Sequence, residues 1–454
     1  MKRLLITNNS LNQRGGTELF VKDLAPLLKA KGWFPIAFST ELGEVASELR
    51  AMAVPVIDDL SNLAEPPDLI HGQHHLDTMA AILRFPGVPV VHFCHGFLPW
   101  EEIPVKHPRV RRYVAVSAPC RERLVTEHGV PASEVEMLLN FVDTELFQAR
   151  GPLPDKIARI LVFGNQLGRS SPLFEKLTEV ARHMGATLDL VGQKVGNTTR
   201  CPQNILPLYD LVVASGRCAL EGMASGCAVL AADAHGLGGL VTPERFDAYR
   251  AHNFGLSLTS QCPAPSVDHL IQELSRYSPQ DCHLVTQRIR TEASLEGAVA
   301  KLILIYEQAL GQKEPADHPH FPTTTAAAES AYMTWICREF KERERQARII
   351  ISSCEEAVRD AAEVRRDALA ARSHCESLAA LLREREAVVE NQGRALSVQE
   401  IRNLDQAAEL STAQCELRNA NAQILKLQSQ LKESRQRLDR FRGARRFLPR
   451  WMVR

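Results

Sequence analysis

The feature that most constrains the fold is an alternation of near-continuous apolar runs with amphipathic segments. It begins with the apolar RLLIT, the amphipathic TELFVKDLAPLLKAKG and the apolar PIAFST, and it continues with DLIHGQHH, VPVVHFCHG and RRYVAVSA. Apolar runs this continuous are typical of strands that are buried on both faces of a parallel sheet, with the intervening helices as cover. We therefore predict a doubly wound α/β domain over residues 1–152.

The same alternation restarts after the proline-bearing stretch ARGPLPDKIA. The apolar runs RILVFGN, ATLDLVGQ, DLVVASG and CAVLAAD follow one another at the spacing of βα units. They predict a second doubly wound domain over residues 153–311. Two such domains that face each other form a cleft between the carboxyl ends of their strands, where ligands bind in folds of this kind.

The last third of the chain has a different composition. A proline-bearing linker over residues 312–328 is followed by a long stretch without proline that is rich in charge and alanine. Seven-residue spacing joins Leu417, Ile424, Leu431 and Leu438, and Ala420, Leu427 and Phe441 occupy the companion position. This heptad pattern predicts a coiled coil over residues 329–442 rather than a lone solvated helix, and a homo-oligomer formed through it.

The final segment, residues 443–454, combines arginines with aromatic side chains. Such a segment can lie on an anionic membrane surface, and a frayed, solvated terminus is an equal alternative. No stretch approaches the roughly 20 apolar residues of a membrane helix. The 11 cysteines include no CxxC pair, which favours reduced thiols, and the formal net charge of zero argues against a nucleic-acid partner. We expect a cytoplasmic protein, with peripheral contact at the inner face of the cell membrane left open.

One acidic residue, Glu221, stands in an otherwise apolar stretch, DLVVASGRCALEGMASGCAVLAAD. This stretch predicts a strand, a tight turn, a short helix and a second strand, with Glu221 in the first turns of the helix. A carboxylate at this place either complements the helix dipole or accepts hydrogen bonds from a vicinal diol such as a ribose. In the first domain, RGGTE places Gly15 and Gly16 at a helix start, where backbone N–H groups can face an anion.

Histidines are unusually dense at the ends of two adjacent predicted strands: His71, His74, His75, His92 and His95. Imidazoles at strand ends suit zinc, so a metal hydrolase is an alternative. No carboxylate lies beside these histidines at ligand spacing, and we therefore expect no metal. His71 is expected to be a buried structural residue, and His95 is the histidine that we place in the cleft.

The motifs RGGTE, HFCHG, VAVSAPCRERLV, NFVDTELF, VFGN and ALEGMASGCAVLAAD, in this order, resemble those of GT-B glycosyltransferases, particularly the retaining family-four enzymes. The resemblance covers roughly residues 1–310. It implies two Rossmann-like domains and transfer of a hexose-type sugar, with retention, from a nucleoside-diphosphate sugar to a glycan or lipid-linked acceptor. It also implies a role in bacterial surface polysaccharide synthesis. No DxD motif occurs, so we expect no metal on the diphosphate.

The resemblance also implies roles for individual residues. His95 and Arg169 would be catalytic, with His95 beside the donor sugar and Arg169 beside the pyrophosphate. Residues from both domains would bind the donor: Gly15, Gly16, Asn140, Lys176, Arg217, Glu221, Gly238 and Gly239. Among these, Glu221 would hold the ribose hydroxyls, and Gly238 and Gly239 would lie in a glycine-rich loop.

The sequence departs from the family pattern at one position. Many relatives carry a further glutamate eight residues before the ribose-binding one, but here that position is Val213, inside a predicted strand. Arg217 is the only charged side chain in the turn before Glu221. This departure keeps a second hypothesis open, in which the chain is a non-catalytic, nucleotide-binding GT-B-like scaffold that oligomerises or recruits partners through its coiled coil.

Overall fold

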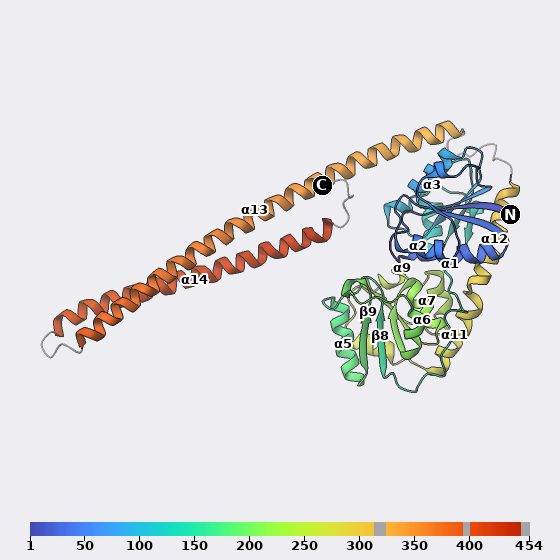
Figure 1. Cartoon of the computed structure of the whole chain (residues 1–454). Coiled ribbons are helices and arrows are strands. Elements are labelled where there is room, and N and C mark those ends of the chain that lie inside the picture. Colours follow the sequence, from blue (N-terminus) through green and yellow to red (C-terminus); the bar gives the residue numbers. More distant parts are fainter. Residues whose placement is uncertain (313–323, 394–399, 446–454) are drawn as a thin grey trace. The chain divides into compact units, whose positions relative to one another are not determined.

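The computed structural model describes residues 1–312, 324–393 and 400–445. The chain divides into two compact units, Met1–Ala331 and Tyr332–Arg454. The first unit contains two sheets, coloured blue to cyan and green in Figure 1, and the second consists of long helices. The apolar runs of the sequence form the strands of both sheets, as predicted.

The first sheet is entirely parallel and has the order β3-β2-β1-β4-β5-β6-β7. Its strands are β1 (Lys2–Thr7), β2 (Trp33–Phe38), β3 (Val56–Ile57), β4 (Leu69–Gln73), β5 (Val90–Cys94), β6 (Val110–Ala115) and β7 (Val135–Met137). Helices α1 (Gly16–Ala30), α2 (Glu44–Ala51), α3 (His75–Arg84) and α4 (Ala118–Glu122) connect them. Because all strands are parallel, the loops that carry polar residues gather at one edge.

The second sheet has the order β12-β11-β10-β8-β9 and is parallel except for β12. Its strands are β8 (Arg159–Phe163), β9 (Thr187–Val191), β10 (Leu211–Ala214), β11 (Ala228–Asp233) and β12 (Gly236–Leu240). The helices of this part are α5 (Pro172–Met184), α6 (Pro202–Ile205), α7 (Gly216–Ala224), α8 (Phe246–Ala251), α9 (Leu256–Thr259), α10 (Val267–Leu274) and α11 (Pro279–Glu292).

The prediction of a glycine-rich loop around Gly238 and Gly239 is wrong, because both residues belong to β12. Gly239 pairs with Ala231 of β11, and Gly238 lies at a register shift in this pairing. A Cβ at Gly238 would lie 2.6 Å from Cγ of Leu258. Gly239 adopts φ +111°, and a Cβ there would lie 2.6 Å from the carboxylate of Glu273. Both glycines are therefore required by the close packing of β12 against α9 and α10, and Gly239 also by its positive φ.

The chain crosses between the two sheets twice, and the two crossings are joined. The N–H of Val142 donates to the carbonyl of Ala293 at 2.9 Å, and the N–H of Leu295 donates to the carbonyl of Val142 at 3.0 Å. The following helix, α12 (Leu295–Gly311), packs on α1 and on the first sheet, where Tyr306 is fully buried. The last helix of the predicted second domain thus completes the core of the first.

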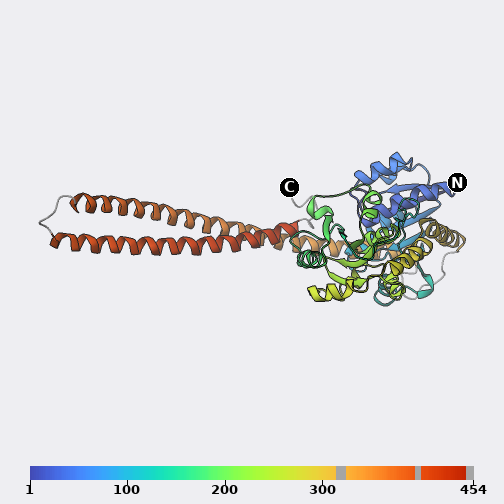
Figure 2. The ribbon, with the colours of Figure 1, turned by 90° about the horizontal axis from the view of Figure 1, so that it is seen from below.

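The second unit contains most of helix α13 (Thr325–Gly393) and all of α14 (Glu400–Arg445), which run antiparallel beside each other (Figures 1 and 2). Arg385 of α13 pairs with Glu409 of α14 at 3.3 Å. On α14 the predicted heptad residues are the covered ones, with Ala420 buried and Leu417, Ile424, Leu427 and Leu431 half-buried. The helices are confirmed, and a coiled coil between copies stays a prediction.

The proposed membrane-binding tail lies, from residue 446 on, outside the described residues, and the side chains of Leu438 and Phe441 do too. Across the described ranges, none of the helices combines the length and the apolar character that crossing a bilayer requires.

Candidate functional site

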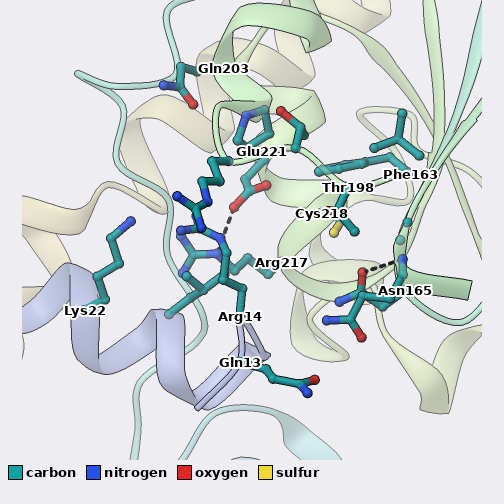
Figure 3. A pocket seen from close by; sticks show the side chains of 18 of the residues that line it. Gln13, Arg14, Lys22, Phe163, Asn165, Thr198, Gln203, Arg217, Cys218 and Glu221 are labelled. Carbon is teal, nitrogen blue, oxygen red and sulfur yellow. Dashed lines mark hydrogen bonds and ion pairs between the residues drawn. The ribbon is translucent and has the colours of Figure 1, made fainter. Parts of the chain in front are cut away.

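A cavity of about 760 Å³ lies at the carboxyl ends of both sheets (Figure 3). The first domain contributes the loop after β1, α1 and the start of α2. The second domain contributes the ends of β8 and β9 and the start of α7. Its polar and charged lining residues include Gln13, Arg14, Lys22, Asp23, Glu44, Asn165, Gln193, Arg200, Arg217 and Glu221. The predicted cleft is therefore present, and both predicted residues of α7 line it.

The turn between β10 and α7 explains why Arg217 and Glu221 lie together. The helix α7 begins at Gly216, directly after the capping residue Ser215. Gly216 adopts φ +57°, a backbone conformation that glycine adopts without strain, and this allows the short turn. Arg217 and Glu221 are then four residues apart and lie on the same face of α7. The nitrogen Nε of Arg217 donates to Oε1 of Glu221 at 2.8 Å.

Arg217 also reaches the other wall of the cavity. Its Nη2 donates to the carboxylate of Asp23, which belongs to α1. The side chains are 18% exposed for Arg217, 14% for Asp23 and 6% for Glu221. Burial raises the pKa of Glu221, and Arg217 opposes that rise. Burial lowers the pKa of Arg217, but Asp23 and Glu221 together raise it above its usual value, so the guanidinium stays charged.

Further cations from both domains line the cavity. Arg14 and Lys22 both pair with Glu48, the lysine at 2.9 Å. Arg200 of the second domain pairs with Glu44 of the first at 2.9 Å. None of these cations was predicted from the sequence, although Arg14 directly precedes the glycines of RGGTE.

A smaller cavity of about 160 Å³ brings together four of the predicted residues: Gly16, Asn140, His95 and Arg217. Thr17, Phe20 and Phe141 complete its lining. Of the residues that line the two cavities, Arg217 is common to both. Arg217 therefore stands at their junction.

His95 is held against Phe20 with the ring centroids 4.7 Å apart, edge to face. Burial lowers the pKa of His95 to about 4, so the imidazole is neutral at pH 7. Its buried Nε2 has no hydrogen-bond partner within the part of the chain that the structure describes. A neutral imidazole of this kind can donate to, or accept from, a hydroxyl of a ligand.

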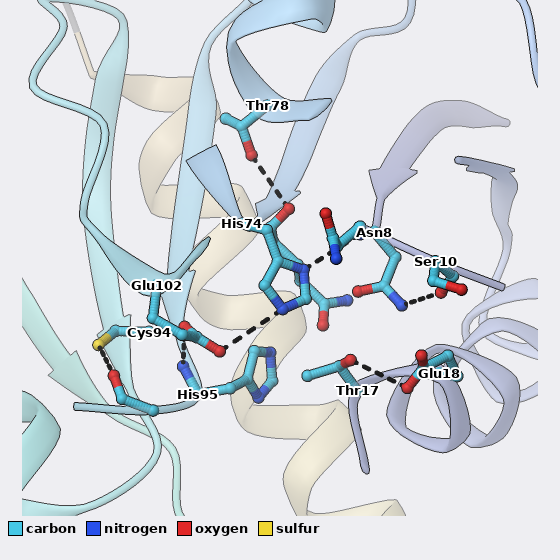
Figure 4. Close-up of polar contacts among 12 residues, drawn as sticks. Asn8, Ser10, Thr17, Glu18, His74, Thr78, Cys94, His95 and Glu102 are labelled. Carbon is cyan, nitrogen blue, oxygen red and sulfur yellow. Dashed lines mark hydrogen bonds and ion pairs between the residues drawn. The ribbon is translucent and has the colours of Figure 1, made fainter. Parts of the chain in front are cut away.

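A buried pair, Glu102 and His74, fixes the backbone of His95 (Figure 4). Glu102 accepts a hydrogen bond from the N–H of His95 at 2.8 Å, and its other oxygen lies 3.5 Å from Nε2 of His74. Burial alone would lower the pKa of His74, but Glu102, Asp77 and Glu18 raise it. Burial raises the pKa of Glu102, yet the bond to His74 and the charges around it bring the pKa below its usual value. Both shifts favour the ionic form of the pair, a charged imidazole beside a charged carboxylate.

His71 is a structural residue, as predicted. It is fully buried, its ring stacks on Phe93 with centroids 3.9 Å apart, and its Nδ1 is hydrogen-bonded to the hydroxyl of Tyr306. Among residues 1–312, 324–393 and 400–445, no group of three or more His, Cys, Asp and Glu side chains is arranged to hold a metal ion.

Other predicted site residues lie elsewhere: of the described residues, Gly15, Arg169, Lys176, Gly238 and Gly239 line neither cavity. Gly15 caps the start of α1, next to Gly16. Arg169 is exposed in the loop after β8, and the ammonium of Lys176 donates to the carbonyl of Pro265 at 2.7 Å.

Comparisons with known proteins agree with this architecture. Residues 14–146 match the family model described as Glycosyltransferase Family 4. A crystal structure of a glycosyltransferase from Rickettsia africae is 15% identical, covers 69% of this chain and 99% of its own, and has a TM-score of 0.52. Comparison with curated proteins gave no match.

Two further solved structures have lower scores. Anabaena HepE in complex with UDP and glucose is 15% identical over 68% of this chain and 100% of its own, with a TM-score of 0.48. The lipopolysaccharide outer core galactosyltransferase WaaB is 12% identical over 68% of this chain and 99% of its own, with a TM-score of 0.43. The sheet topology and the Rickettsia structure together show that the chain has the GT-B fold, two Rossmann-like domains that face each other across a cleft, with a long helical extension.

Proposed function

We propose that the chain is a glycosyltransferase that moves a hexose-type sugar from a nucleoside-diphosphate sugar to a glycan or lipid-linked acceptor. The observation that carries this proposal is the cavity between the two domains, which combines a buried carboxylate, Glu221, with the cations Arg14, Lys22 and Arg217. A nucleoside diphosphate presents the matching groups, a ribose diol and a diphosphate. The family match over residues 14–146 supports the same class of reaction.

Each part of the donor has a place in this proposal. Arg217 holds Oε1 of Glu221, so Oε2 is the oxygen left to accept a hydrogen bond from a ribose hydroxyl. The diphosphate would lie near the junction of the two cavities, beside Arg217. The small cavity would take the sugar, with His95 and Asn140 as hydrogen-bonding partners.

In the transfer step, the oxygen of the acceptor hydroxyl forms a bond to the anomeric carbon while the bond from that carbon to the diphosphate breaks. The electron pair of the broken bond stays on the diphosphate, and fixed cations such as Arg217 stabilise the negative charge that develops there. We propose that the departing phosphate accepts the hydroxyl proton, that the anomeric configuration is retained and that no metal is needed.

The test measures nucleotide binding and transfer separately. Glu221→Ala should weaken UDP or GDP binding at least about tenfold in calorimetry, because a lost hydrogen bond to a charged group is worth about 1.5–3 kcal/mol. Glu292→Ala, at an exposed carboxylate of α11, is the matched control. Unchanged affinity in Glu221→Ala would refute the role of Glu221. Transfer from a panel of nucleotide sugars with EDTA present tests the metal, and NMR of the product tests retention.

The second candidate is a nucleotide-binding scaffold without catalysis. Two observations favour it: Val213 is fully buried in β10, and Arg217 already occupies one oxygen of Glu221. The scaffold predicts nucleotide binding without hydrolysis or transfer for any donor of the panel, and light scattering should then show an oligomer. Binding to anionic liposomes would support a place at the inner face of the cell membrane. A role in the synthesis of a bacterial surface polysaccharide stays a proposal that rests on the family resemblance.

A further inference from the structure

Asp23 is the residue that joins the first domain to the donor-binding carboxylate of the second. It lies on α1, its side chain is 14% exposed, and it accepts a hydrogen bond from Nη2 of Arg217. Nε of the same guanidinium donates to Glu221. Asp23, Arg217 and Glu221 thus form one connected row of side chains that runs from one wall of the cavity to the other.

We propose that Asp23 is a positioning residue for the donor: through Arg217 it fixes the carboxylate of Glu221, so that the affinity for the nucleotide depends on the first domain as well as on the second. The proposal rests on the proposed function, because it assumes that Glu221 binds the nucleotide. Asp23 itself need not contact the ligand.

The planar guanidinium makes this transmission effective. Its nitrogens lie in a rigid fork, so bonds from Nε and Nη2 to two different carboxylates fix both the position and the plane of the group. Without Asp23, Arg217 is held at Glu221 alone and can rotate together with it. The binding of a nucleotide must then order both side chains, and this lowers the affinity.

The same arrangement leaves the third nitrogen of Arg217, Nη1, to bind the ligand. The two carboxylates occupy Nε and Nη2, which leaves Nη1 for the ligand. Because Arg217 lines both cavities, this nitrogen is available to the diphosphate of a nucleoside-diphosphate sugar. Asp23 therefore orients two ligand-binding groups at once, the carboxylate of Glu221 and the Nη1 nitrogen of Arg217.

The chain offers a matched control for this proposal. Glu307 of α12 forms an ion pair with Lys2 of β1, and neither residue lines either cavity. Both side chains are 46% exposed. Removal of this pair loosens a contact between α12 and the first sheet without removing the support of Arg217. The comparison separates the positioning of Glu221 from a general effect of the loss of an ion pair.

The experiment is calorimetric titration of the full chain with UDP and with GDP. Asp23→Asn and Asp23→Ala should each weaken binding of the preferred nucleotide about tenfold. Asp23→Glu, which keeps the carboxylate, should stay within about threefold of the natural chain, and Glu307→Gln within about twofold. In an Arg217→Met background, Asp23→Asn should have no further effect, because the residue that transmits the effect is gone.

Thermal unfolding of each variant, measured beside the titrations, shows that the comparison is made between folded proteins. An unchanged affinity in both Asp23 variants would overturn the proposal, and so would a tenfold loss on Asp23→Asn that persists without Arg217. If the natural chain binds neither UDP nor GDP, the proposed function itself has failed. If the natural chain binds and Glu221→Ala does not, while the Asp23 variants bind normally, the positioning role alone is wrong.

Discussion

Replacement of Arg217 by methionine should destabilise the folded chain strongly and in a pH-dependent way. Methionine keeps much of the apolar stem of the side chain but removes the cation between Asp23 and Glu221, whose side chains are 14% and 6% exposed. Removal of one partner of a buried ion pair typically costs about 3–5 kcal/mol, because a buried charge is left without a partner. Since the carboxylates line a cavity, we expect a value near the lower end, about 3 kcal/mol.

The pH dependence follows from Glu221. Burial raises its pKa and Arg217 lowers it, so the pKa of Glu221 rises further when Arg217 is absent. A carboxyl group whose pKa is higher in the folded than in the unfolded state favours folding as the pH falls, because the folded state then binds the additional proton. The loss of stability should therefore be largest near pH 8 and smaller by at least about 1 kcal/mol near pH 5.

Urea denaturation of the full chain, followed by circular dichroism at pH 5 and pH 8, measures both quantities. Because a chain with several domains can unfold in steps, the first transition is the one to compare. Arg288→Met is the matched control: Arg288 is 31% exposed and pairs with Asp247 and Glu292 at the surface, so its loss should cost less than about 1 kcal/mol. A loss in Arg217→Met no larger than in this control, or equal losses at the two pH values, would refute the reasoning.

Two further predictions concern the first domain. Tyr306→Phe removes the hydroxyl that pairs with His71, and leaving the buried Nδ1 without a partner should lower the free energy of unfolding by about 1–3 kcal/mol; an unchanged urea midpoint would contradict this. Glu102→Gln removes the carboxylate that raises the pKa of His74, so NMR titration should show that pKa falling. The stabilisation by this pair is present between the pKa of Glu102 and that of His74 and is lost above the latter; a stability loss at pH 9 as large as at pH 6 would contradict an ionic pair.

The fold was largely predictable because its strands are fully buried and therefore continuous in their apolar character. All nine predicted strands are present. Within the described ranges, three further strands were not predicted, for two physical reasons. The strands β3 and β7 are only two and three residues long, too short to show a period. The third, β12, is rich in glycine, which suggested a loop, although Gly239 is a glycine because Glu273 leaves no room for a Cβ.

The residues of the candidate site were predictable only where a short sequence pattern indicated them. The apolar surroundings of Glu221 marked one wall of the larger cavity, and Gly16 of RGGTE marked part of the lining of the smaller one. The partner of Arg217 could not be found in this way, because Asp23 lies 194 residues away along the chain and occupies an ordinary helical position. The role of Arg169 was implied only by the family resemblance, and the loop after β8 carries this residue out to the surface.

The paired crossings at Val142 and Leu295 limit how the two Rossmann-like domains can move. A single connecting segment would let one domain twist about the other, whereas two segments joined by backbone hydrogen bonds restrict that twist. A restricted twist keeps α1 opposite α7, which is the arrangement in which Asp23 accepts a hydrogen bond from Arg217.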